Sequence, residues 1–107
     1  MKKRDKNKFL FFFYPEERGH YSVFSPDFYQ ATCGRNKSEA KRMAGDLANI
    51  LWDLEEYKDL GDLKKRKTHL EVDPLDLYYE CTGQELKHNE REGIFYRYVS
   101  PKLYVCK

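Results

Sequence analysis

Six residues near the start of the chain, FLFFFY at 9–14, include five aromatic side chains and one leucine, and they limit how the chain can fold. Side chains of this kind favour the pleated surface of a sheet. Because a strand alternates its side chains between two faces, positions 9, 11 and 13 share one face and positions 10, 12 and 14 share the other. Both faces are apolar. We therefore predict a central strand over Lys8–Tyr14 that is covered on both sides.

The same run does not suit a signal peptide or a membrane helix. A signal needs roughly 7–15 apolar residues and a small-residue cleavage site, whereas this run stops at Pro15 and the charged residues Glu16, Glu17 and Arg18 follow. No stretch approaches the roughly 20 apolar residues of a membrane helix. We expect no membrane partner and a cytoplasmic location.

Length and charge favour a single domain over residues 1–107 with a basic N-terminal tail at 1–7. The net charge is only +2, so a uniformly basic nucleic-acid-binding protein is not indicated, although a second basic run lies at 64–67. Three cysteines without CxxC spacing argue against a disulfide framework and against a zinc ribbon. We expect no metal and no other cofactor.

Turn residues divide the first third of the chain into strands. Pro15 and Gly19 bracket the loop PEERG, which suits a hairpin between Lys8–Tyr14 and a second strand over His20–Phe24. After the turn SPDF, Tyr29–Cys33 is a short third strand that ends at Gly34.

A long amphipathic helix follows over residues 37–57. Asn36 is a suitable N-cap, Glu39 stands three residues later as in a capping box, and Gly61 is a suitable C-terminal stop. Apolar residues recur at helical spacing at Ala40, Met43, Ala44, Leu47, Ile50, Leu51, Leu54 and Tyr57. This helix would pack on one face of the sheet.

The second half is less regular. Residues 62–73 are charged and read as loop, and residues 74–86 fit either a short helix or irregular structure. Ile94–Val99 is a strand that Leu103–Cys106 would extend beyond Pro101. The predicted fold class is α+β: an antiparallel sheet of three or four strands with one long helix, in the order β-β-β-α-β.

Three segments, YPEERGHYSVFSPDF, TCGRNKSEA and the helix to Glu56, resemble the HicB-like antitoxin family. The family's Tyr-Pro pair, acidic-Gly turn and Pro-Asp turn are matched at Tyr14, Pro15, Gly19, Pro26 and Asp27. Its Thr-x-Gly segment and Glu-Ala pair are matched at Thr32, Gly34, Glu39 and Ala40. The likeness covers about half of the chain and departs from the family at Ser25, at residues 29–31 and at Arg35.

The resemblance implies a partial RNase H-like fold and a non-catalytic role. Members of this family block a small RNA-cleaving toxin by protein–protein contact, and many also repress their operon through an appended DNA-binding domain. We expect only the first of these two roles here, without the appended domain. The implied partner is therefore a small toxin ribonuclease. One helix cannot cover both faces of the sheet, so the second face must meet the C-terminal segment or another chain, and a homodimer is expected.

Enzyme chemistry finds little support in the sequence. A two-metal nuclease needs converging carboxylates, and the first strand contains none. Asp27 is the best acidic candidate, yet Pro-Asp in a turn is more often a backbone cap. No histidine stands in a recognisable nucleophile context. We predict no enzyme, with a metal-dependent nuclease as the least favoured hypothesis.

Direct RNA binding is the alternative to protein binding. Aromatic side chains beside basic ones can stack bases and contact phosphates. The candidate residues for a partner or for RNA are Tyr14, Tyr21, Asp27, Tyr96, Arg97 and Tyr98. The opposing interpretation is that the aromatic residues fill a core between sheet and helix.

Overall fold

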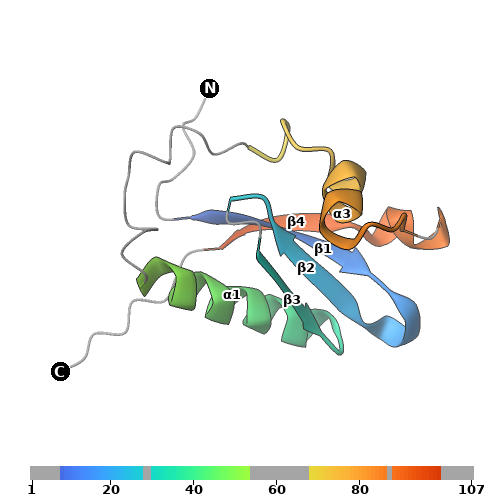
Figure 1. Cartoon of the computed structure of the whole chain (residues 1–107). Coiled ribbons are helices and arrows are strands. Elements are labelled where there is room, and N and C mark those ends of the chain that lie inside the picture. Colours follow the sequence, from blue (N-terminus) through green and yellow to red (C-terminus); the bar gives the residue numbers. More distant parts are fainter. Residues whose placement is uncertain (1–7, 28–29, 54–67, 87, 100–107) are drawn as a thin grey trace.

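The computed structural model of the chain describes residues 8–27, 30–53, 68–86 and 88–99. Their elements, shown in Figure 1, are β1 (Phe9–Pro15), the 3-10 turn η1 (Glu17–Gly19), β2 (Tyr21–Ser25), β3 (Gln30–Gly34), α1 (Lys37–Asp53), α3 (Pro74–Thr82), the 3-10 segment η3 (His88–Gly93) and β4 (Phe95–Val99). The strands form one antiparallel sheet in the order β3-β2-β1-β4.

This architecture confirms the predicted α+β class and adds a second helix. Each strand differs from its predicted bounds by at most one residue at either end. The predicted end of the long helix near Tyr57, the stop at Gly61 and the extension Leu103–Cys106 lie outside the described residues. The wider likeness to RNase H stays a resemblance.

Strand β1 is the centre of the sheet. Phe12 pairs with Phe24 of β2 on one side and with Tyr96 of β4 on the other. Every side chain from Phe9 to Tyr14 is buried. The prediction of a central strand covered on both faces is therefore confirmed.

The first face of the sheet packs against α1. Phe9, Phe11, Phe13 and Val23 form one core cluster with Ala40, Ala44 and Ala48. These alanines recur every four residues and so lie along one side of the helix, where their small side chains let helix and sheet approach closely. At the entry to α1 a Cβ on Gly34 would lie 2.3 Å from the backbone nitrogen of Ala40.

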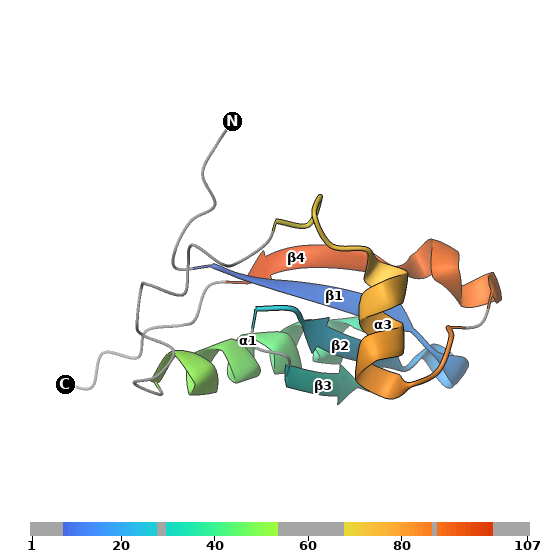
Figure 2. The same cartoon turned by 45° about the horizontal axis from the view of Figure 1, so that its top comes forward.

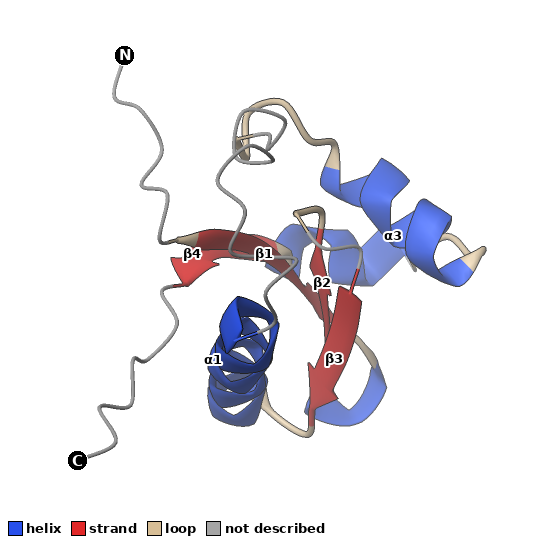
Figure 3. Cartoon of the chain, turned by 60° about the vertical axis from the view of Figure 1, so that its left-hand side comes forward, coloured by secondary structure: helices blue, strands red, loops and turns tan. Residues whose placement is uncertain are grey.

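The second face packs against α3, as Figures 2 and 3 show: α3 lies across β1 and β2, and α1 lies on the other side of the sheet. Leu77, Tyr78 and Leu86 join Leu10, Phe12, Tyr14 and Phe24 in a second core cluster. The chain thus covers both faces of β1 with its own helices. Packing alone no longer requires another chain, which removes that argument for a dimer.

Local signals explain why α3 forms where the periodicity was ambiguous. Asp73 accepts a hydrogen bond from the backbone N–H of Leu75 at 2.9 Å, Pro74 occupies the first turn, and Gly83 ends the helix with φ +72°. This is the usual asymmetry of proline at the start of a helix and glycine at its end. Those signals were present in the sequence and outweigh the weak apolar period.

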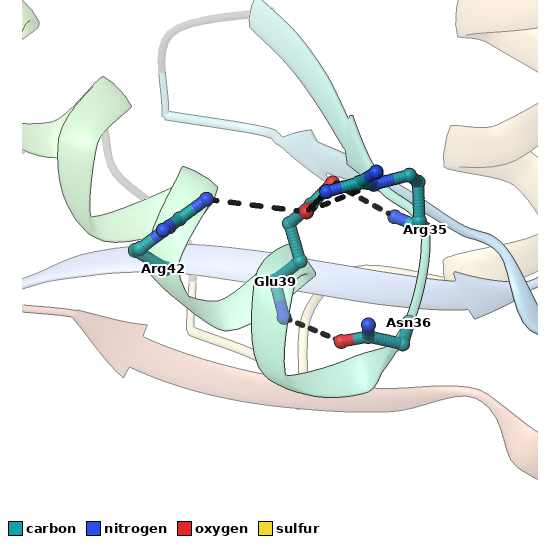
Figure 4. Close-up of polar contacts among 4 residues, drawn as sticks. All are labelled: Arg35, Asn36, Glu39 and Arg42. Carbon is teal, nitrogen blue, oxygen red and sulfur yellow. Dashed lines mark hydrogen bonds and ion pairs between the residues drawn. The ribbon is translucent and has the colours of Figure 1, made fainter.

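Asn36 caps the N-terminus of α1 as predicted, and Glu39 reaches back one residue further than in a capping box (Figure 4). The Asn36 side chain accepts from the backbone N–H of Glu39 at 2.8 Å. The Glu39 carboxylate reaches back to the backbone N–H of Arg35 at 3.1 Å and to its guanidinium at 2.9 Å. These bonds from Arg35 lower the pKa of the Glu39 carboxyl. Among the described helices, none is long and apolar enough to cross a membrane.

Candidate binding surfaces

Five of the six candidate residues from the sequence lie on two faces of the sheet, and the sixth, Asp27, lies in the turn after β2, so the six do not form one site. Residues paired across antiparallel strands point to the same face. Tyr14, Tyr96 and Tyr98 therefore lie on the α3 side. Tyr21 packs against the α1 cluster, and Arg97 pairs with Phe11, which places it on the α1 side.

Tyr14 is part of the core. Its side chain is fully buried, and its hydroxyl donates a hydrogen bond to the carbonyl of Pro74 at 2.6 Å. Burial, followed by the nearby Cys81, Asp73 and Tyr78, raises the pKa of this phenol far above its usual range. Tyr14 thus ties β1 to the start of α3 and offers no surface to a partner.

Tyr21 and Asp27 also hold the fold together. The Tyr21 ring meets Phe95 edge-on, with centroids 6.0 Å apart. The Asp27 carboxylate accepts from the backbone N–H of Leu10 at 2.8 Å, at a point on β1 beyond its last pairing with β2. This backbone contact matches the capping role that the Pro-Asp turn suggested.

Tyr96 and Tyr98 form an aromatic cluster with His69. The imidazole of His69 stacks on the Tyr96 ring, with centroids 3.9 Å apart and planes 12° from parallel. The Tyr98 hydroxyl accepts from the backbone N–H of His69 at 2.9 Å and lies 3.0 Å from its Nδ1. Next to His69, Leu70 is 84 % exposed. The sequence missed this cluster because His69 lies 29 positions from Tyr98 in a segment read as charged loop.

An open hollow of about 300 Å³ lies between the β1–β2 hairpin and the end of α3. One carboxylate in it is oriented by the fold: Glu16 accepts from the Tyr78 hydroxyl at 2.9 Å and from the hydroxyl of Ser22. The hollow is lined by Glu16, Glu17, His20, Tyr78, Gln84, Glu85 and Leu86. Sequence reasoning missed it because Glu16 and Tyr78 are 62 positions apart, and the segment 74–86, which carries Tyr78, fits either a short helix or irregular structure.

Positive charge gathers on the α1 side of β4. The ammonium groups of Lys37 and Lys41 lie 5.1 and 5.8 Å from the centre of the Phe95 ring. Arg97 is two residues along β4 from Phe95 and so faces the same side. Within the part of the chain that the structure describes, none of these three cations forms an ion pair with a carboxylate.

Among the described residues, two free and exposed cysteines, Cys33 and Cys81, are the candidates for thiol or metal chemistry. No group of three or more His, Cys, Asp or Glu side chains there could hold a metal ion. Burial, and then the charge of Glu80, raises the pKa of the Cys81 thiol, so the reactive thiolate is disfavoured. Cys106 lies outside the described residues.

No protein-family model matches the sequence, and neither the curated proteins nor the solved structures contain a significant match. The residues and their geometry are therefore the basis for any functional inference.

Proposed function

We propose that the chain is a non-catalytic protein-binding module that engages a small basic partner in the manner of an antitoxin, and that it acts in the cytoplasm. The acidic hollow beside the β1–β2 hairpin is the observation that carries this proposal. The resemblance to HicB-like antitoxins adds the class of partner: a small RNA-cleaving toxin whose catalytic surface the module covers. Homodimerisation stays part of the proposal.

The hollow suits a basic side chain from such a partner. Three carboxylates line it, from Glu16, Glu17 and Glu85, and its volume of about 300 Å³ leaves room for an arginine or lysine side chain. Because Tyr78 and Ser22 already orient Glu16, a guanidinium would meet a carboxylate whose position is set in advance.

A first experiment uses a hexa-arginine peptide as the probe and isothermal titration calorimetry at low salt. Glu85→Lys should weaken binding by about tenfold, equal to about 1.4 kcal/mol. The matched control is Asp46→Lys, which makes the same charge change at an exposed position of α1. If the two variants bind equally weakly, the effect reflects net charge alone and the hollow is not the site.

A second experiment tests inhibition directly. A small basic RNA-cleaving toxin of the class that HicB-like antitoxins block is purified, and its cleavage of a labelled RNA is measured with increasing amounts of the chain. We expect inhibition at stoichiometric concentration, weaker inhibition with Glu85→Lys, and full inhibition with Asp46→Lys. A chain that leaves cleavage unchanged at saturating concentration would contradict the proposal.

Direct RNA binding is the alternative, and the exposed Tyr96 ring stacked on His69 is the observation in its favour. Against it, Tyr96 and Arg97 point to opposite faces of β4, so one strand of RNA cannot use both in the usual way. A salt titration of single-stranded RNA affinity separates the two functions, because several phosphate contacts make binding fall steeply with salt.

The nuclease hypothesis is the least supported. Its best acidic residue, Asp27, holds the backbone of Leu10. Incubation of RNA with the chain and Mg²⁺ or Mn²⁺ tests it, and cleavage that Asp27→Asn abolishes would revive it.

A further inference from the structure

We infer that the outer edge of β4 binds an extended acidic polypeptide segment, which adds to the sheet as a further strand. This surface is separate from the acidic hollow and has the opposite charge. Its occupant is therefore a different kind of partner from the basic protein proposed above.

Strand β4 is one margin of the sheet, as Figure 3 shows. Its inner side pairs with β1 from Phe9↔Val99 to Phe13↔Phe95, and among the described strands none pairs with its outer side. An edge strand of this kind presents backbone N–H and C=O groups that can pair with an added strand. Backbone hydrogen bonds supply affinity there, and the flanking side chains determine which peptide sequences bind.

The α1 side of this edge is positively charged. Arg97 points to that side, and Lys37 and Lys41 bring their ammonium groups to the Phe95 ring from the helix. Both lysines are held against an aromatic ring, which fixes their charge close to β4. None of the three has a carboxylate partner in the described part of the chain. Glutamate or aspartate side chains on an added strand would supply those partners.

The α3 side of the same edge is apolar and aromatic. Tyr96 is 43 % exposed even though His69 covers one face of its ring, and Leu70 beside it is 84 % exposed. An added strand would place aromatic or aliphatic side chains here. The edge is therefore complementary to a segment in which acidic and apolar residues alternate.

This alternation favours a polypeptide over RNA or a second copy of β4 as the occupant of the edge. A strand directs successive side chains to opposite faces, so a single extended segment meets the cations on one side and the rings on the other. An RNA strand would have to wrap around the edge to bring its phosphates to the cations on one face and its bases to the rings on the other. A second copy of β4 would bring its own Arg97 toward the same cations, and like charges directly opposite are destabilising.

The probe is the peptide EVEYEVE with blocked ends, labelled for fluorescence anisotropy at low salt. Binding should weaken by about fivefold or more in Arg97→Glu and in Lys41→Glu, and change by less than about twofold in Arg42→Glu, the matched charge reversal on the far side of α1. The charge-reversed peptide KVKYKVK should not bind. In amide NMR spectra of the intact chain, the largest shifts should fall within Phe95–Val99.

Two N-methylated forms of the probe test strand addition itself. One form carries methyl groups on one set of alternate amides, and the other form carries them on the remaining set, with no change in charge. Only one set can face β4, so one form should lose binding and the other should retain it. Equal binding by both forms, concentration-dependent self-association that excludes the peptide, or tighter binding of single-stranded RNA to the same residues would overturn the inference.

Discussion

Gly34 lies where β3 ends and α1 begins, and the space there is too small for one added carbon. A Cβ at this position would lie 2.3 Å from the backbone nitrogen of Ala40 and 2.6 Å from its Cα. Backbone atoms cannot move aside as a flexible side chain can, so Gly34→Ala must shift the start of α1. We expect it to lower the free energy of unfolding by about 1–3 kcal/mol, measured by urea denaturation.

Gly45 is the matched control for that substitution, because its surroundings are the reverse. It lies within α1, and a Cβ there would meet nothing within 4 Å. Alanine has a higher helix propensity than glycine by about 1 kcal/mol, so Gly45→Ala should raise the free energy of unfolding by up to that amount. A loss of stability on Gly45→Ala would contradict the packing described for this side of the helix.

Arg18 carries local backbone strain in the hairpin. Its φ is +61°, in the left-handed region that costs a non-glycine residue roughly 1–2 kcal/mol. Arg18→Gly removes the strain and adds some conformational entropy to the unfolded chain, so the net gain should be about 0.5–1 kcal/mol in urea denaturation. Arg18→Ala keeps the strain, and an equal gain from alanine would show that loss of the charge is responsible.

At the scale of elements, the hydrogen bond between Tyr14 and Pro74 joins the central strand to α3. The raised pKa of Tyr14 means that the folded chain keeps this phenol neutral where the unfolded chain ionises it, above its ordinary pKa of about 10. The stability that this group contributes is present below about pH 10 and is lost as pH rises further. Unfolding by urea between about pH 8 and 11.5 should show that decline.

Tyr14→Phe separates this group from the other tyrosines. At neutral pH the variant should be less stable by about 1 kcal/mol, because the hydrogen bond to Pro74 is lost. Above about pH 10 the difference should shrink or reverse, since phenylalanine does not ionise in the unfolded state. Parallel pH profiles for the two proteins would contradict the assignment.

The elements that could be predicted are those whose signals are local. The run 9–14 indicated a doubly covered strand, Asn36 and Glu39 marked the start of α1, and Gly19 closed the hairpin with φ +76°. Helix α3 does not stand out by apolar periodicity, because its signals are Asp73 and Pro74 at its start and Gly83 at its end. In a helix of only 9 residues, the capping residues at its two ends predict the helix better than its apolar period does.

At the scale of the whole molecule, the binding surfaces could not be predicted, because each joins residues from distant parts of the chain. Glu16 meets Tyr78, and His69 meets Tyr96 and Tyr98, only after α3 and the turn before it are in place. The sequence places Tyr96 and Arg97 on opposite faces of a strand, because they are adjacent, but it could not show which helix covers each face. It also named Tyr14 and Tyr21 as binding candidates if they faced solvent, with burial in a core as the opposing interpretation, and tertiary packing puts both in contact with core clusters.

The composition of β1 also affects the chain before it folds. FLFFFY is uncharged, rich in β-forming residues and free of proline, which is the composition of segments that assemble into amyloid-like zippers. In the folded chain β1 pairs with β4 from Phe9 to Phe13 and with β2 from Phe12 to Pro15, and both of its faces are covered. During synthesis this segment is made before α3 and β4, so it exists before either element can shield it. The need for chaperones and the yield on expression should therefore depend on how fast α3 and β4 are synthesised and fold.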